Sequence, residues 1–291
     1  MSESHPMKKN NDGKVYTLYY AFFLIPLMVT ILGVMFFFTF KVLTYETNSP
    51  MDYLTDVQYG AATKRWQSAF ELSKLLSNPD LSSLNEGFHA RMISVYEKAI
   101  HDDPSVRMYL ALAMGRTKNL IYGKTLINGL EDKDEASRVA AIKALGNIGY
   151  KPSIKQLIGF TNKHNSVQER LSATIALGNM KDDSVIPRLV YLLNDDEPNV
   201  RWDSAIALAK LENDSGAKII EKLLDRMYYD QFREVDSDEE VQAILIAIQA
   251  SNKIPSEKFV DNLLKLATFD HNMEIRDSAI KSLKKTYNRK I

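Results

Sequence analysis

The stretch NVRWDSAIALAKL, residues 199–211, decides the fold class. Near its start Arg201 stands between the apolar residues Val200 and Trp202, and alanines recur at helical spacing after it. Val200, Ser204, Ala207 and Leu208 fall on one face of a helix, and the remaining alanines extend the apolar surface around it. A helix that is apolar on nearly every side must pack between neighbours, and small side chains let those neighbours approach closely. The stretch therefore predicts an interior helix of an all-α fold.

Near-copies of this stretch occur along the chain at an almost constant spacing. Each copy has a small or apolar residue three positions after its arginine and a small one six positions after it. Gln242 stands at the arginine position of one further copy, and Arg65 marks a weaker first copy. Self-similarity at this period predicts an α-solenoid. The arginines of the first four copies are 31, 32 and 31 residues apart, and a fifth belongs to the last copy: Arg107, Arg138, Arg170, Arg201 and Arg276.

A second, more amphipathic helix follows most copies, so the predicted repeat unit is a pair of helices. Pro152 and Pro187 stand near the first turn of such helices, where a missing amide donor costs little. The predicted repeat domain covers residues 61–291. Within it we expect six helical pairs and then a lone helix, near residues 61–100, 104–131, 134–163, 166–194, 198–228, 237–268 and 272–288.

The repeat unit resembles a known family. A two-helix unit of about 31 residues with the pattern acid-x-x-V-R-x-x-A-x-x-A-L-G is similar to HEAT repeats, and in particular to the short HEAT-like repeats described in phycobilin lyases. The resemblance covers residues 101–288 and, more loosely, 61–100. It implies a curved solenoid with a groove for another macromolecule. It does not imply lyase activity, because such repeats occur in many unrelated proteins and a membrane anchor departs from the soluble lyases.

The recurring arginines have two interpretations. Each lies beside an apolar residue at the start of a packed helix, near an acidic turn of its own or the adjacent repeat. A guanidinium can lay its stem along apolar surface and direct its donors to carboxylates or free carbonyls. The favoured interpretation is a structural ladder that ties one turn to the next, and the alternative is a row that binds a ligand.

The segment VYTLYYAFFLIPLMVTILGVMFFFTF, residues 15–40, contains no charge and is long enough to cross a bilayer. No small-x-small cleavage site follows it, so we interpret residues 15–41 as an uncleaved transmembrane helix. Lys8, Lys9 and Lys14 precede the segment and only Lys41 follows it closely.

This charge difference predicts the topology of the chain. The positive-inside rule places the tail, residues 1–14, in the cytoplasm and the large C-terminal domain outside it, which would be the periplasm in a bacterium. Residues 42–60 are then expected to form a tether between the membrane and the repeats.

The repeat period breaks once, between Arg201 and Gln242, and the excess lies near residues 226–239. Insertions in solenoids often lie on the binding face, and aromatic residues and arginine are favoured at contact hot spots. The alternative is an extended second helix whose aromatics pack on the next repeat, with the tryptophans as packing residues. The candidate partner-binding residues are Tyr228, Tyr229, Phe232 and Arg233, together with Trp66 and Trp202 at a shared repeat position.

Composition narrows the functional classes. The chain has 37 basic and 37 acidic residues, so no global field favours nucleic acid as a partner. It has no cysteine, and its five histidines, at 5, 89, 101, 164 and 271, show no metal-binding spacing. No catalytic motif is present. We therefore expect no catalytic residue, no metal and no cofactor.

Three hypotheses for function follow. The leading one is a single-pass membrane protein whose external solenoid binds a protein partner, as scaffold or accessory subunit of a cell-envelope complex. The second is a lyase-like or chromophore-handling enzyme helper that uses the solenoid groove. The third makes the anchor itself functional through contacts with other membrane helices, although the segment has no G-x-x-x-G motif.

Overall fold

The computed structural model describes residues 19–43, 49–78, 84–99, 103–232 and 235–289. Two compact units divide the chain, residues 1–49 and residues 50–291. The predicted cytoplasmic tail and the candidate contact residue Arg233 lie outside the described residues. Every regular element in the described ranges is a helix, so the all-α prediction is confirmed there.

The N-terminal unit contains one continuous helical segment. A π-helical turn, η1 (Tyr20–Leu24), leads into helix α2 (Ile25–Leu43). Pro26 has no amide donor, and a wider turn just before it accommodates the missing α-helical hydrogen bond. Residues 20–41 are long and apolar enough to span a membrane, and no residue of the scored window is buried.

The second unit consists of helical pairs that match the predicted positions. The first helices are α4 (Ala62–Leu75), α6 (Pro104–Arg116), α8 (Glu135–Ile148), α10 (Val167–Asn179), α12 (Pro198–Lys210) and α14 (Ser237–Ser251). The second helices are α5 (Glu86–Lys98), α7 (Gly123–Gly129), α9 (Ile154–Phe160), α11 (Ile186–Leu192), α13 (Ala217–Leu223) and α15 (Val260–Phe269), and α16 (Met273–Lys285) follows alone. The repeat architecture predicted from the 31-residue period is thus confirmed.

A 3₁₀ turn precedes each of the second helices α7, α9, α11, α13 and α15. These turns are η4 (Leu120–Tyr122), η5 (Lys151–Ser153), η6 (Asp183–Val185), η7 (Asp214–Gly216) and η9 (Glu257–Phe259). A longer 3₁₀ helix, η8 (Arg226–Gln231), lies in the insertion between α13 and α14.

The tether prediction is wrong for residues 50–59, which form helix α3 (Pro50–Tyr59). Leu54 and Val57 of this helix are fully buried, and α3 packs on α4 and α5. The guanidinium of Arg65 donates to the carbonyl of Val57 at 2.7 Å, which fastens α3 to α4. Two apolar residues three positions apart suffice to bury one face of a short helix. The folded domain therefore begins at Pro50 rather than at residue 61.

Close approach between first helices explains the glycine that follows the alanine and leucine of the repeat. A Cβ atom on Gly146 would lie 2.6 Å from the Cα of Ala176, and one on Gly178 would lie 2.5 Å from the Cβ of Ala207. The same holds for Gly115 against Ala144, at 2.7 Å from its Cα. These glycines sit inside α6, α8 and α10 at the points where consecutive first helices touch.

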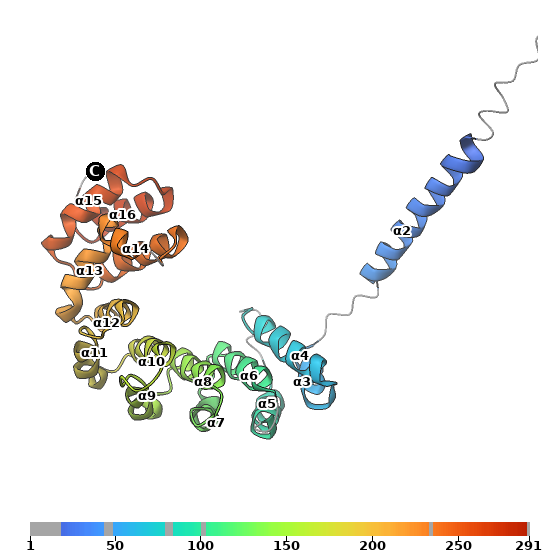
Figure 1. Ribbon diagram of the computed structural model, residues 1–291, viewed down its shortest axis with the longest axis horizontal. Coiled ribbons are helices and arrows are strands. Elements are labelled where there is room, and N and C mark those ends of the chain that lie inside the picture. The colour runs from blue at the N-terminus through green and yellow to red at the C-terminus, as the bar shows by residue number, and fades with distance from the viewer. Residues whose placement is uncertain (1–18, 44–48, 79–83, 100–102, 233–234, 290–291) are drawn as a thin grey trace, which may run out of the picture. The chain divides into compact units, whose positions relative to one another are not determined.

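The second unit curves, with the first helices α4 to α12 along the inner side of the arc and the second helices along its outer side (Figure 1). Two clusters of buried apolar side chains fill the layer between them. The first cluster runs from Leu54 to Leu208, and the second runs from Trp202 to Leu283. The two clusters therefore change over at α12, the helix before the insertion.

Candidate functional site: the inner face of the solenoid

Two arginines of the repeat bind the aspartate of the next acidic turn through both oxygens. Arg107 donates to Asp132 at 2.5 and 3.0 Å, and Arg170 donates to Asp195 at 3.3 and 2.9 Å. In each turn the aspartate also accepts the backbone amide two residues later, at 2.9 Å. Both carboxylates are nearly inaccessible to solvent. The arginine and the amide together satisfy a carboxylate that burial would otherwise penalise.

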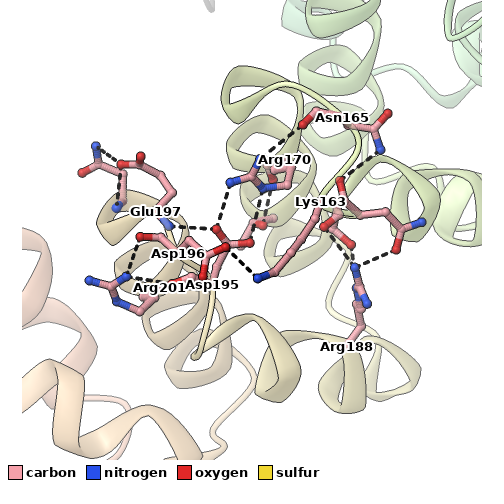
Figure 2. A network of polar contacts seen from close by, with 12 residues as sticks. Lys163, Asn165, Arg170, Arg188, Asp195, Asp196, Glu197 and Arg201 are labelled. Atoms are coloured by element: carbon pink, nitrogen blue, oxygen red, sulfur yellow. Dashed lines mark hydrogen bonds and ion pairs between the residues drawn. The ribbon is translucent and has the colours of Figure 1, made fainter.

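The other arginines bind the backbone of the same turns. Arg138 donates to the carbonyl of Asp132 at 2.7 Å, and Arg201 donates to that of Asp195 at 2.7 Å. Figure 2 shows Arg170 and Arg201 reaching one turn, residues 195–197, from two sides. The turns at 132 and 195 are therefore each held by two arginines, one through the carboxylate and one through the carbonyl.

The last of these turns takes its first arginine from the insertion. The sequence pattern placed Gln242 at the arginine position, but Gln242 is exposed. Arg226 instead donates to both oxygens of Asp270 at 2.7 and 3.1 Å and also to Glu240 at 2.7 Å. Arg276 completes the turn by donating to the carbonyl of Asp270 at 2.6 Å. The three turns at 132, 195 and 270 thus have the same construction.

Electrostatics agree with a structural role for these arginines. Burial alone would raise the pKa of Asp132, but the guanidinium of Arg107 and the amide of Asp134 hold it below its usual range. The same balance, with Arg226 as the cation, lowers the pKa of Asp270. Since the arginines are engaged with the turns, they leave no row of free guanidinium groups for a ligand.

The aromatic residues of the insertion lie together around Trp202. The ring of Trp202 is 5.0 Å from Phe232, 5.8 Å from Tyr229 and 6.1 Å from Tyr228, measured between centroids. The indole of Trp202 donates to the hydroxyl of Tyr228 at 3.3 Å, and the hydroxyl of Tyr229 donates to the carbonyl of Leu223 at 3.0 Å. Trp202 and Tyr229 are buried, and Tyr228 and Phe232 are half-buried against the second core cluster.

This arrangement differs from one of the two interpretations of the insertion, the extended second helix, whereas the interpretation as contact residues stays a prediction. The segment forms η8 rather than an extension of the second helix, and its aromatics pack on Trp202 of α12 within the second core cluster. Trp66 is half-buried against the first core cluster, so the shared repeat position does not bring the two tryptophans together.

A hollow of about 640 Å³ opens on the inner face between α10, α12 and α14. Its floor includes Leu171, Ile206 and Ile246, and Ile246 is 40% exposed. Asp238 and Glu239 at the start of α14 line its rim and are exposed. We call this the inner-face hollow. Among the candidate contact residues that the structure describes, Trp202 lines this hollow. The sequence pattern did not single out the apolar residues of its floor.

Asp203 gives the inner-face hollow a distinctive chemical group. It is half-buried, and within the described part of the chain its carboxylate has no hydrogen bond and no ion pair. Burial raises the pKa of Asp203 to about 6, and the charge of Lys210 opposes that rise. A desolvated carboxylate beside an apolar floor can receive a cationic side chain that brings its own apolar stem. In the sequence, Asp203 reads as an ordinary solvated helix residue.

A second cavity of about 540 Å³ lies at the turn edge, lined by Tyr96, Glu97, Arg107 and Asp132. Arg107 and Asp132 are engaged with each other there, and burial raises the pKa of Tyr96 above its usual range. Nearby, His89 is buried and shares a 2.6 Å hydrogen bond with the hydroxyl of Tyr122. In the residues that the structure describes, no three His, Asp or Glu side chains group as a metal site.

The model of HEAT repeats matches residues 93–170 and 154–235. Residues 93–235 contain HEAT repeats. No curated protein matches the chain. Among solved structures, the complex of CpcE and CpcF of phycocyanin lyase from Nostoc sp. PCC7120 is 21% identical, with 84% of this chain and 96% of that chain covered and a TM-score of 0.50.

Two engineered proteins are also similar to these HEAT repeats. One is 19% identical over 81% of this chain and 68% of its own, with a TM-score of 0.47. The other is 17% identical over 83% of this chain and 98% of its own, with a TM-score of 0.45. At these identities the likeness concerns the fold alone, and the predicted resemblance to HEAT repeats is confirmed at that level.

Proposed function

We propose that this HEAT-repeat chain is a membrane-anchored scaffold that binds a protein partner in the inner-face hollow. The observation that carries the proposal is the combination in one concave surface of exposed Ile246 and of Asp203, whose carboxylate has no partner among the residues that the structure describes. Exposed apolar surface rimmed by polar residues is typical of protein contact sites. A carboxylate beside it suits an arginine or lysine anchor of the partner, because such anchors dominate many interfaces.

The anchor completes the proposal. Residues 20–41 supply a helix of sufficient length, and Lys8, Lys9 and Lys14 before it outnumber Lys41 after it. We therefore place the N-terminus in the cytoplasm and the repeats outside it, as an accessory subunit of a cell-envelope complex. The proposal assigns the chain no catalytic residue, no cofactor and no nucleic-acid partner.

Topology can be tested with single cysteines, because the chain has none of its own. A membrane-impermeant maleimide applied to intact cells should label Lys284→Cys, which is at an exposed position. It should label Ser2→Cys only after the membrane is permeabilised. The opposite pattern would place the repeats in the cytoplasm and overturn the orientation.

Partner binding can be tested by photocrosslinking from the hollow. A photoreactive amino acid in place of Ile246 should give a discrete protein adduct in solubilised membranes. The same group in place of Leu264 on α15, which is 37% exposed and away from the hollow, is the matched control. Asp203→Lys should abolish the Ile246 adduct by charge repulsion. Equal adducts from Ile246 and Leu264, or an Ile246 adduct that Asp203→Lys does not reduce, would show that the partner does not bind in the hollow.

A further inference from the structure

Another hollow, of about 610 Å³, lies at the C-terminal ends of the first helices. Its lining includes Lys118, Lys181, Lys210 and Lys253, with Asn147 and Asn179 among them. We call it the lysine hollow. The four lysines follow or end four different first helices, α6, α10, α12 and α14, so the repeats rather than one loop assemble this surface. Within the described part of the chain, no acidic side chain lines it.

Several exposed lysines elsewhere in the repeat domain are paired with carboxylates. Lys64, Lys151 and Lys163 form ion pairs with carboxylates at 2.6 to 3.1 Å. Lys210 donates instead to the amide oxygen of Asn179 at 3.1 Å. Among the described residues, the ammonium groups of Lys118, Lys181 and Lys253 have no such partner. Cations favour helix C-termini, which accounts for one lysine at each helix end but not for the lack of any carboxylate around a shared space.

A residue in the left-handed conformation follows several of the first helices. Lys118 and Lys181 have φ angles of 53° and 50°, in the left-handed region that glycine adopts without strain. Gly149 holds the equivalent place after α8, with φ of 68°, and lines the same hollow. A lysine costs more than a glycine at such a position. Glu212, with φ of 56°, holds the equivalent place after α12, so the left-handed conformation belongs to the ends of the first helices and serves here to place Lys118 and Lys181 in the lining of the hollow.

The lysine hollow adjoins the inner-face hollow along α12. Asp203, Ile206 and Lys210 are spaced three and four residues apart, so they lie on one face of this helix. Asp203 and Ile206 line the inner-face hollow, and Lys210 lines the lysine hollow. A bound segment that crosses α12 therefore meets an acid, then apolar surface, then cations.

We propose that the lysine hollow binds an acidic stretch of the partner protein, next to the basic and apolar residues that enter the inner-face hollow. This inference rests on the proposed scaffold function, since it concerns the same bound partner. The pattern of charges on α12 fixes the order of the motif: a lysine or arginine with apolar neighbours at one end and several carboxylates at the other. Complementary charges across an interface give specificity and speed of association.

Fluorescently labelled hexaglutamate is the probe for the lysine hollow, with the full chain in detergent at low salt. Binding should weaken about fivefold in Lys181→Gln/Lys253→Gln, because each exposed charge pair contributes modestly. It should also weaken as salt is raised. The matched control is Lys64→Gln/Lys163→Gln, which removes the same charge from exposed, ion-paired lysines. Equal weakening in both double variants would overturn the proposal, as would no binding to the unaltered chain.

Two further measurements separate the possible outcomes. Inorganic phosphate that displaces hexaglutamate at equal molar concentration would assign the hollow to phosphate and overturn the acidic-segment proposal. The photocrosslink from Ile246 should be reduced in Lys181→Gln/Lys253→Gln and unchanged in the control. An unchanged crosslink in the lysine variant would overturn this inference and leave the scaffold function standing, whereas no Ile246 crosslink in the unaltered chain would overturn the scaffold function itself.

Discussion

The regular stack from α6 to α12 and the junction between α12 and α14 solve the same problem with different residues. In the regular stack, an arginine at a fixed repeat position holds the next acidic turn, as Arg170 holds Asp195. At the junction the period is broken, and Arg226 of the insertion holds Asp270 with the same two-oxygen geometry. What the two regions share is a buried aspartate that needs a cation, so the requirement belongs to the turn and not to the repeat position.

The largest predicted effect comes from removing those cations. Arg170→Ala and Arg226→Ala each leave a carboxylate that is 2% or 1% exposed without its cation, so each should lower the free energy of unfolding by about 3 kcal/mol. Urea unfolding of the full chain, followed by circular dichroism, measures this. Unequal losses would show that the regular stack and the junction do not depend on their arginines to the same degree.

Arg201→Ala is the control, because its guanidinium donates to backbone carbonyls and pairs with no buried carboxylate in the described structure. Its loss should be about 1 kcal/mol. An Arg226→Ala variant as mild as Arg201→Ala would show that the junction does not depend on the insertion's arginine.

Helix contact gives the next effect, and it is confined to the regular stack. Gly146→Ala should cost about 2 kcal/mol, because the new Cβ atom would lie 2.6 Å from the backbone of Ala176. Gly159→Ala meets no atom within 4 Å and should be neutral or slightly stabilising. Thermal unfolding of the two variants compares them directly. Similar melting temperatures would mean that the first helices can separate at little cost.

A pH-dependent effect distinguishes the inner-face hollow from the turns. The pKa of Asp203 is raised to about 6 in the folded state, so folding favours its protonated form. Its ionisation therefore removes stability as pH rises through the window from about 4 to 6. Asp203→Asn should stabilise the chain by about 1–2 kcal/mol at pH 7 and by nothing near pH 4.

The turns should behave oppositely. The pKa values of Asp132 and Asp270 are lowered, so the stability they provide is present above their ordinary pKa and is lost as pH falls below it. Urea midpoints of Asp203→Asn and of the exposed control Asp238→Asn, measured from pH 4 to 7.5, test the sign for Asp203. Midpoints of the unaltered chain and of Asp132→Asn, measured as pH falls below 4, test the sign for the turns. A stabilisation by Asp203→Asn that does not change with pH would mean that the carboxylate is not desolvated.

The stack could be predicted from the sequence because each repeat carries the same types of residue at the same positions. Alanine and glycine at fixed positions indicated close helix contacts, and the arginine beside an acidic turn indicated the ladder from Arg107 to Arg201. Helix α3 was missed because Leu54 and Val57 are two apolar residues among polar ones, and their burial depends on α4 and α5. The contact from Arg226 to Asp270 joins residues 44 positions apart and follows no period.

The candidate site was harder to predict for the same reason. Asp203 follows a tryptophan on a helix, and nothing local distinguishes it from a solvated acid until α10 and α14 close around it. The aromatic residues of the insertion stand out in the sequence, but in the structure they pack into the second core cluster, at the break in the repeat period. The proposed binding surface instead consists of single residues contributed by successive repeats.

The smallest effect decides whether the aromatic cluster is packing or contact surface. Tyr228→Phe removes the 3.3 Å hydrogen bond from Trp202 and keeps the ring, so it should lower the free energy of unfolding by about 0.5 kcal/mol. Because the ring packs against Trp202 and Phe232 rather than standing free, the photocrosslink from Ile246 should be unchanged. A variant of normal stability that loses the crosslink would assign Tyr228 to the partner, and the insertion would then contribute to binding as well as to the core.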